Sequence, residues 1–126
     1  MKLHADKLDF QSITAYGEGW IAVNGQRHTQ SLVLASSGQP QPWDCSGFDQ
    51  LTAAHFDRLL GLSTEPPELV VFGSGARLRF VHPALLSNLI ERRIGVETMD
   101  TPAACRTYNI LAAEGRRVVV ALLIEA

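Results

Sequence analysis

The tripeptide Gly73-Ser74-Gly75 is the part of the sequence whose residue types could bind a phosphate. It follows the apolar run Leu69–Phe72, and glycines at the end of a buried strand can let backbone N–H groups approach a pyrophosphate. A dinucleotide-binding loop needs a third glycine where Leu78 stands, and the following helix is expected only from Pro83. The Gly-Lys-Ser or Gly-Lys-Thr ending of a P-loop is also absent. The sequence therefore favours a strand exit in which glycines allow close backbone contact, with phosphate binding as the alternative.

A second group of polar residues follows the predicted strand Val96–Met99. If this strand runs parallel to the one before the glycine tripeptide, both end at the carboxyl edge of the sheet, where α/β proteins bind ligands. A small anion could then meet the N–H groups of the helix that starts at Thr101, with Arg106 as a counter-charge and Asn109 nearby. The favoured interpretation is that these residues have a structural role. Asp100 and Thr101 then cap the helix, while Arg106 is solvated and Asn109 bonds to nearby backbone.

Cys105 could be a nucleophile, because it lies near the N-terminal end of the same helix, where the helix dipole lowers the pKa of a thiol. A nucleophile also needs a positioned base, and of the four histidines only His82 belongs to the same half of the chain. We therefore expect Cys105 to be a small buried residue that packs the helix on the sheet. The sequence has no HxH, HExxH or CxxC pattern, so it predicts neither a metal site nor a cofactor.

Trp43 lies in a polar loop that is rich in proline and glycine, SSGQPQPWDCSG. A large aromatic residue in such a loop either anchors the loop or contacts a partner protein, because tryptophan often anchors protein interfaces. The sequence alone leaves both interpretations open.

The first fifty residues contain short apolar segments that predict strands. The predicted strands are Ile13–Tyr16, Trp20–Val23 and Thr29–Leu34. The pair Asn24-Gly25 is typical of a type I′ hairpin turn, in which both central residues have positive φ. The sequence therefore predicts an antiparallel β-meander that is packed on one face.

The rest of the chain, residues 51–126, predicts a helix over Thr52–Leu60 and then alternating strands and helices. The predicted strands are Leu69–Phe72, Val96–Met99 and Val118–Ile124, and the helices between them begin near Pro83 and Thr101. Strands that are joined by crossover helices are ordinarily parallel. We expect one three-layer α/β domain over residues 1–126, with a mixed central sheet, crossover helices and an N-terminal antiparallel β layer in residues 1–50.

The composition indicates a folded protein. Of its 126 residues, 46% are hydrophobic and 19% are charged, which excludes intrinsic disorder. The formal net charge is -2 and no basic cluster occurs, so binding to nucleic acid through its phosphates is not expected. The charged N-terminus MKLHADKLDF and the lack of an apolar run of about 18 residues predict a soluble, cytoplasmic protein with no membrane insertion.

Three stretches of the sequence resemble a known family: LVVFGSGARLRF, IGVETMDTPAACRTYNILAAEGRRVVVALL and the earlier QPWD. That family consists of small α/β domains of unknown function, and it includes the mitochondrial complex I (NADH dehydrogenase) assembly factor 3 and the adipogenesis-associated domain protein. The order of the motifs matches across nearly the whole chain. The resemblance implies a mixed central sheet with helices on one side and additional strands on the other. It also implies a last strand that is antiparallel to its neighbours, and it supplies no catalytic residue.

Two functions are compatible with these observations. The favoured one is a non-catalytic binding or assembly module whose partner is another protein, such as a respiratory component, because the sequence contains no recognisable triad, metal set or carboxylate pair. The alternative is a small-molecule or anion-binding protein, or a weak enzyme, that uses the edge formed by Gly73-Ser74-Gly75 and Thr101–Asn109.

Overall fold

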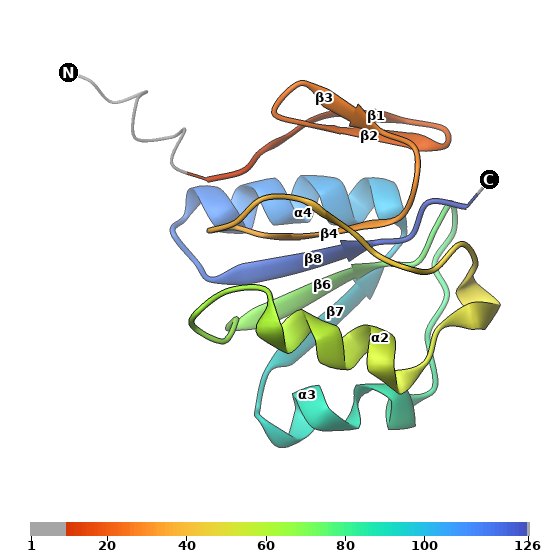
Figure 1. Cartoon of the computed structure of the whole chain (residues 1–126), viewed down its shortest axis with the longest axis vertical. Helices are drawn as coiled ribbons and strands as arrows, with labels where there is room; N and C mark the ends of the chain where they lie inside the picture. The colour runs from red at the N-terminus through yellow and green to blue at the C-terminus, as the bar shows by residue number, and fades with distance from the viewer. Residues whose placement is uncertain (1–9, 126) are drawn as a thin grey trace.

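The computed structural model describes residues 10–125 and contains two β-sheets (Figure 1). The smaller sheet is antiparallel and consists of β1 (Ile13–Gly17), β2 (Trp20–Val23) and β3 (Gln26–His28). Asn24 and Gly25 join β2 to β3 with φ angles of 49° and 84°, so the predicted hairpin turn is confirmed. The N-terminal segment interpreted above lies, apart from Phe10, outside the described residues.

The larger sheet has five strands in the order β5-β4-β8-β6-β7. Its strands are β4 (Leu32–Ala35), β5 (Gln41–Pro42), β6 (Leu69–Gly73), β7 (Gly95–Met99) and β8 (Val118–Leu122). Strand β6 is parallel to β7 and β8, whereas β4 is antiparallel to β8 and β5. The predicted mixed central sheet is therefore confirmed.

Helices cover both faces of the larger sheet. Helix α4 (Thr101–Ala113) and the three-stranded sheet pack on one face, while α2 (Ala53–Asp57) and α3 (Ser87–Glu91) pack on the other (Figure 1). Three 3-10 turns accompany the short helices: Phe48–Gln50 before α2, Arg58–Gly61 after it and Pro83–Leu86 before α3. This is the predicted three-layer arrangement. The longest of these helices, α4, has 13 residues, and no helix in residues 10–125 is long and apolar enough to cross a membrane.

Strand β8 lies at the centre of the core and contributes side chains to both faces. Val118, Val120 and Leu122 face α4 and the three-stranded sheet, whereas Val119 and Ala121 face α2 and α3. All five residues are buried. Burial on both faces explains why this strand has no polar residue.

The predicted strand Thr29–Leu34 is wrong in its place and its limits. The third strand of the small sheet is Gln26–His28, and the chain then crosses to the larger sheet, where Leu32–Ala35 forms β4. The physical reason is burial. Strand β3 is mostly exposed and polar, whereas all four residues of β4 are buried and need packing partners on both faces.

The arrangement implied by the family resemblance is also wrong in two respects. The helices lie on both faces of the larger sheet, and the additional strands share a face with α4. The last strand, β8, is antiparallel to β4 but parallel to β6. Because α4 returns the chain from β7 to β8 as a crossover, the ordinary rule for β-α-β units holds here.

Candidate functional site

The glycine tripeptide lies where β6 leaves the larger sheet, beside the first turn of α4. A Cβ atom at Gly73 would lie 3.0 Å from the Cα of Thr101 and 3.1 Å from the Cβ of Ala104. Such distances are shorter than ordinary contacts between carbon atoms. Gly73 therefore allows α4 to approach the end of β6 closely.

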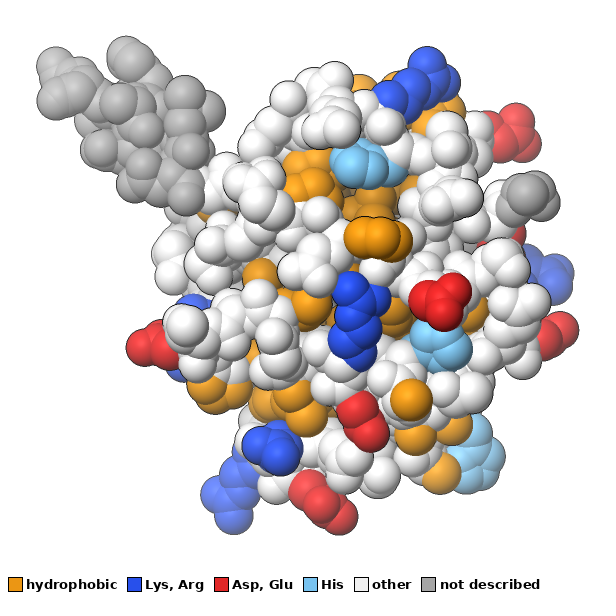
Figure 2. Space-filling view, viewed as in Figure 1, with side chains coloured by type: hydrophobic (Ala, Val, Ile, Leu, Met, Phe, Trp, Pro, Cys, Tyr) orange, Lys and Arg blue, Asp and Glu red, His pale blue; other side chains and the backbone are white. Residues whose placement is uncertain are grey.

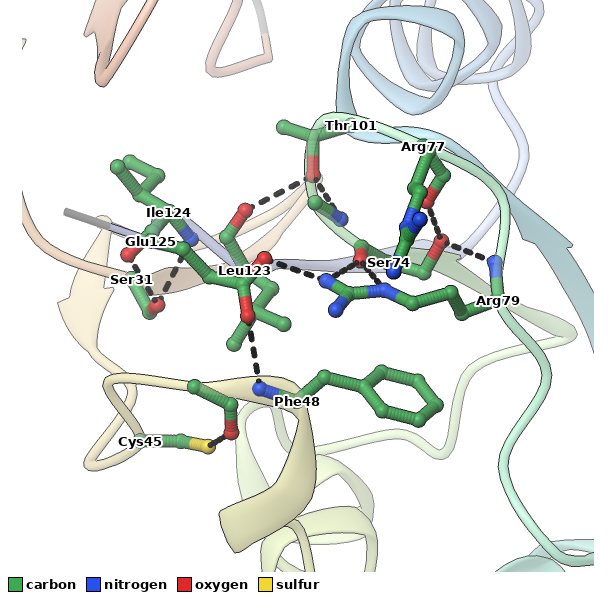
Figure 3. A network of polar contacts seen from close by, with 12 residues as sticks. Ser31, Cys45, Phe48, Ser74, Arg77, Arg79, Thr101, Leu123, Ile124 and Glu125 are labelled. Carbon is green, nitrogen blue, oxygen red and sulfur yellow. Dashed lines mark hydrogen bonds and ion pairs between the residues drawn. The ribbon is translucent and has the colours of Figure 1, made fainter.

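Gly75 makes room for a different contact. Its φ is +104°, which residues with side chains rarely adopt, and a Cβ there would lie 2.5 Å from Nη2 of Arg79 and 2.7 Å from Oε1 of Glu125. These two side chains form an ion pair (Figure 3). The missing side chain at position 75 thus permits a charged contact between the loop after β6 and the segment after β8.

The hydroxyl groups beside the glycines bond within the protein. The Ser74 hydroxyl donates to a carbonyl of its own loop (2.8 Å) and accepts from the Arg79 N–H (2.9 Å). The Thr101 hydroxyl accepts from the Gly75 N–H and donates to the Leu123 carbonyl, both at 2.9 Å (Figure 3). Both side chains belong to buried residues, so these bonds close the loop against its neighbours.

Glu125 joins the C-terminal segment to two loops. Its carboxylate accepts a hydrogen bond from the backbone N–H of Phe48 (3.0 Å) and forms the ion pair with Arg79. The Arg79 guanidinium also lies 4.5 Å from the centroid of the Phe48 ring. Burial alone would raise the pKa of Glu125, but the Phe48 N–H and the Arg79 charge together hold that pKa below its ordinary value. Glu125 is therefore ionised at neutral pH and acts as a structural acceptor.

The first three residues of α4 have no N–H group left for an anion. The Thr101 N–H donates to the Gly75 carbonyl (2.8 Å), and Pro102 has no N–H. The Ala103 N–H donates to the Asp100 carboxylate (2.8 Å), which makes Asp100 the N-cap. This geometry favours the capping interpretation of this helix end.

Arg106 and Asn109 contact β1 instead of the glycine tripeptide. The Asn109 side chain accepts from the Ile13 N–H (2.9 Å) and donates to the Ile13 carbonyl (2.7 Å), as a neighbouring strand would. The exposed Arg106 donates to the Tyr16 hydroxyl (2.7 Å), and this bond raises the pKa of the guanidinium. The structure therefore brings four of the predicted residues together, and these are Gly73, Ser74, Gly75 and Thr101.

Cys105 is fully buried in the cluster between α4 and the larger sheet, as predicted. Burial raises the pKa of its thiol to about 12, so the thiol is protonated at neutral pH. Among residues 10–125, no three His, Cys, Asp or Glu side chains gather closely enough to hold a metal ion.

Trp43 is only 2% exposed and anchors its loop. Its ring packs edge-on against Phe56 and Phe72, with ring centroids 5.7 Å and 6.0 Å away. Its indole N–H donates to the His55 carbonyl (3.2 Å). Of the two interpretations that the sequence leaves open, this geometry agrees with Trp43 as an anchor of its loop. It does not fit an exposed contact to a partner protein.

A cleft of about 840 Å³ lies beside Gly75 and Thr101. Its lining is completed by residues 16–21 of the β1–β2 hairpin, by Ala76 and Pro102, and by residues 123–125. The lining contains two acids, Glu18 and Glu125, and no basic residue. Its charge therefore suits an uncharged or cationic molecule better than an anion.

Sequence reasoning missed Phe48, Arg79 and Glu125 as members of this site. Arg79 lies in an alternating polar and apolar segment, and Glu125 follows the last predicted strand, so each resembles an ordinary surface charge. The signal that was present is Gly75, because a glycine at a strand exit often leaves room for a close contact. The sequence does not indicate which residues fill that room.

Comparison with curated proteins shows clear relatives. The chain is 33% identical over 111 residues to NADH dehydrogenase (ubiquinone) 1 alpha subcomplex assembly factor 3 of Bos taurus, covering 88% of this chain and 59% of that protein. It is 34% identical over 111 residues to an uncharacterized protein of Rhodobacter capsulatus, covering 88% of this chain and 82% of that protein. The chain thus spans less than two thirds of the length of the bovine assembly factor.

Solved structures share the fold. A crystal structure of a Bordetella parapertussis protein is 41% identical, with a TM-score of 0.86, and covers 92% of this chain and 97% of that one. An outer membrane protein from Bartonella henselae is 32% identical, with a TM-score of 0.80, and covers 93% of this chain and 97% of that one. Residues 13–123 match the family described as protein of unknown function (DUF498/DUF598), and the family resemblance predicted from the sequence is confirmed. The chain belongs to this DUF498/DUF598 family.

Proposed function

We propose that this chain is a non-catalytic protein-binding module that takes part in the assembly of a respiratory complex in the cytoplasm. The observation that carries the proposal is the 33% identity, over 88% of the chain, to a protein named as an assembly factor of NADH dehydrogenase. Because the chain covers 59% of that relative, the similarity concerns the α/β region that both proteins share.

The geometry beside the glycine tripeptide supports the same proposal. Ser74, Thr101 and Glu125 use their oxygens for hydrogen bonds within the chain. Cys105 is buried as a protonated thiol. In the proposal, these residues hold the start of α4 and the C-terminal segment in place, and the surface of the protein carries the function.

The surface supports a protein partner rather than a nucleic acid. On the face seen in Figure 2, acidic and basic side chains are interspersed, with hydrophobic side chains between them. Large hydrophobic side chains are also exposed, and Phe80 and Ile110 are 70% and 60% exposed. Protein interfaces combine such apolar side chains with a polar rim, whereas nucleic acids need a basic surface.

Two measurements test this function together. An affinity-tagged full chain is purified from native lysate of its source organism, and NADH dehydrogenase assembly is followed on native gels in cells that lack the chain. We expect a reproducible protein partner and slower appearance of the mature complex, which the wild-type gene restores. A normal rate of assembly together with no reproducible partner would contradict the proposal.

A second candidate function, binding of a small molecule, is supported by the cleft beside Gly75 and Thr101. A thermal-shift screen of nucleotides, organic acids and organic cations tests it, because a ligand at 100 times its Kd adds about 2.7 kcal/mol to the free energy of unfolding. We expect Ala76→Trp, at the rim of the cleft, to remove such a shift. The matched control is Ala113→Trp, at the exposed end of α4. The absence of a shift with every ligand class would exclude this candidate.

A further inference from the structure

The two edge strands of the larger sheet, β5 and β7, differ in how much room they leave for a further strand. At one edge, β5 has two residues, and the Arg58 guanidinium donates to the Pro42 carbonyl (2.6 Å) and to the Gln41 side chain (3.0 Å). Proline has no N–H, so this edge offers little to a further strand. At the other edge, β7 has five residues, contains no proline or lysine, and pairs, among the described residues, with β6 alone.

The outward hydrogen-bonding groups of β7 belong to Val96 and Thr98. The Ser74 N–H donates to the Met99 carbonyl (2.8 Å), which continues the ladder between β6 and β7. In a parallel ladder every second residue bonds to the same neighbouring strand, so Glu97 and Met99 bond to β6. Val96 and Thr98 therefore direct their N–H and C=O groups toward the free edge. Within residues 10–125, no further strand pairs with these groups.

An exposed acid stands between these two residues. Glu97 is exposed and forms no ion pair with another described residue. Its neighbours Val96 and Thr98 are β-branched, a type that favours strand pairing. The free edge thus combines two sets of backbone groups with one central negative charge.

A second copy of this chain fits the edge poorly. The antiparallel register that uses every outward group of both copies places Val96 of each opposite Thr98 of the other. The two Glu97 residues are then directly opposite, in a pair whose Cα atoms are about 4.5 Å apart. Like charges at such positions destabilise strand pairing.

We propose that β7 is the docking site for an extended segment of another protein, which adds to the sheet antiparallel to β7 and carries a Lys or Arg opposite Glu97. The proposal rests on the proposed protein-binding function and names its surface. Backbone hydrogen bonds from Val96 and Thr98 supply the attachment, as in other cases of strand addition to a free sheet edge. The charge opposite Glu97 supplies the selectivity.

The test uses the full chain and two synthetic peptides, Thr-Thr-Val-Lys-Val-Thr-Thr and its counterpart with Glu at the centre. We expect the Lys peptide to shift the NMR amide signals of Val96 and Thr98 and to slow their hydrogen exchange. It should bind about threefold more tightly than the Glu peptide, because opposite charges stabilise a cross-strand pair and like charges destabilise it. Glu97→Lys should reverse this preference. Glu18→Lys makes the same charge change at the exposed tip of the β1–β2 hairpin and should leave the preference unchanged.

Several results would overturn the β7 site. These are the absence of any effect on Val96 and Thr98, equal binding of both peptides, and an unchanged preference in Glu97→Lys. A preference that moves with Glu18→Lys would place the peptide in the cleft, and protection of Val96 and Thr98 by self-association would place a second copy on β7. Co-purification separates this site from the proposed function. A partner that wild type and Glu97→Lys retain equally contradicts the β7 site alone, whereas the absence of any partner contradicts the function.

Discussion

The two faces of the larger sheet are held to their covering layers by different interactions. On the face of α2 and α3, Trp43, Phe56 and Phe72 pack edge-on against one another, with ring centroids 5.3–6.0 Å apart. Such packing buries large apolar areas and depends on contact at the ring edges. This face is therefore stabilised chiefly by apolar burial.

The α4 face adds directional contacts to its apolar core. The Asn109 side chain pairs with both backbone groups of Ile13, and the Tyr108 hydroxyl donates to the Gln11 carbonyl (2.6 Å). These bonds fix where β1 lies on the helix, because a hydrogen bond forms only within a narrow range of distances and angles. The comparison teaches that both faces bury an apolar core, whereas the polar contacts of α4 also set the position of the small sheet.

The largest expected effect is on the aromatic face. Trp43→Ala should lower the free energy of unfolding by about 3–5 kcal/mol, because it leaves a cavity beside Phe56 and Phe72. Urea denaturation followed by circular dichroism measures this loss. The matched control is Trp20→Ala, since Trp20 is partly exposed on β2 and lies under the Arg27 guanidinium (4.0 Å to the ring centroid). Equal losses in the two variants would contradict the stabilising role of the buried Trp43 ring.

The next effect concerns the attachment of β1. Asn109→Ala should cost about 1–3 kcal/mol, because it leaves the N–H and C=O of Ile13 without partners. Hydrogen exchange should become faster in β1 and β2 while β6 and β8 stay protected. Asn88→Ala removes an exposed contact to Asp57 and serves as the control. Uniformly faster exchange throughout the chain would show that the small sheet does not open independently of the larger sheet.

The sequence predicted the elements of both faces better than their contacts. The apolar runs Leu69–Phe72 and Val118–Ile124 predicted buried strands, because burial on both faces leaves a continuous pattern. The same pattern does not state which strand lies next to which, so the sequence places the predicted strand Thr29–Leu34 in the small meander, whereas Leu32–Ala35 belongs to the larger sheet. Asn109 illustrates the limit for the site. Its residue type predicted a bond to backbone, but the partner, Ile13, is 96 positions away in the sequence.

A smaller effect depends on pH and concerns Glu125, in the segment after β8. Its pKa is lowered in the folded protein, since the Phe48 N–H and Arg79 outweigh the effect of burial. The stabilisation is therefore present above the ordinary carboxyl pKa of about 4.3 and is lost as the pH falls through the lowered value. Glu125→Gln should cost less than about 1 kcal/mol at pH 7, and the difference from wild type should vanish in acid.

Thermal unfolding between pH 7 and pH 2.5 measures this difference. Glu65→Gln is the control, because its ion pair with Arg117 is more exposed, with 73% and 54% of the two side chains accessible. A difference between Glu125→Gln and wild type that stays constant over this pH range would contradict the role of the ionised pair.

The smallest expected effect is at the tip of the small sheet, where Arg106 bonds to the Tyr16 hydroxyl. Both side chains are exposed, so water replaces this bond when either partner is removed. Arg106→Ala and Tyr16→Phe should each leave the urea midpoint of unfolding unchanged within the error of the measurement, and the double variant should show no coupling between the two sites. A measurable coupling between the two substitutions would mean that this exposed contact also holds the hairpin to α4. The position of the small sheet would then depend on the exposed contact of Arg106 as well as on the less exposed polar contacts of Tyr108 and Asn109.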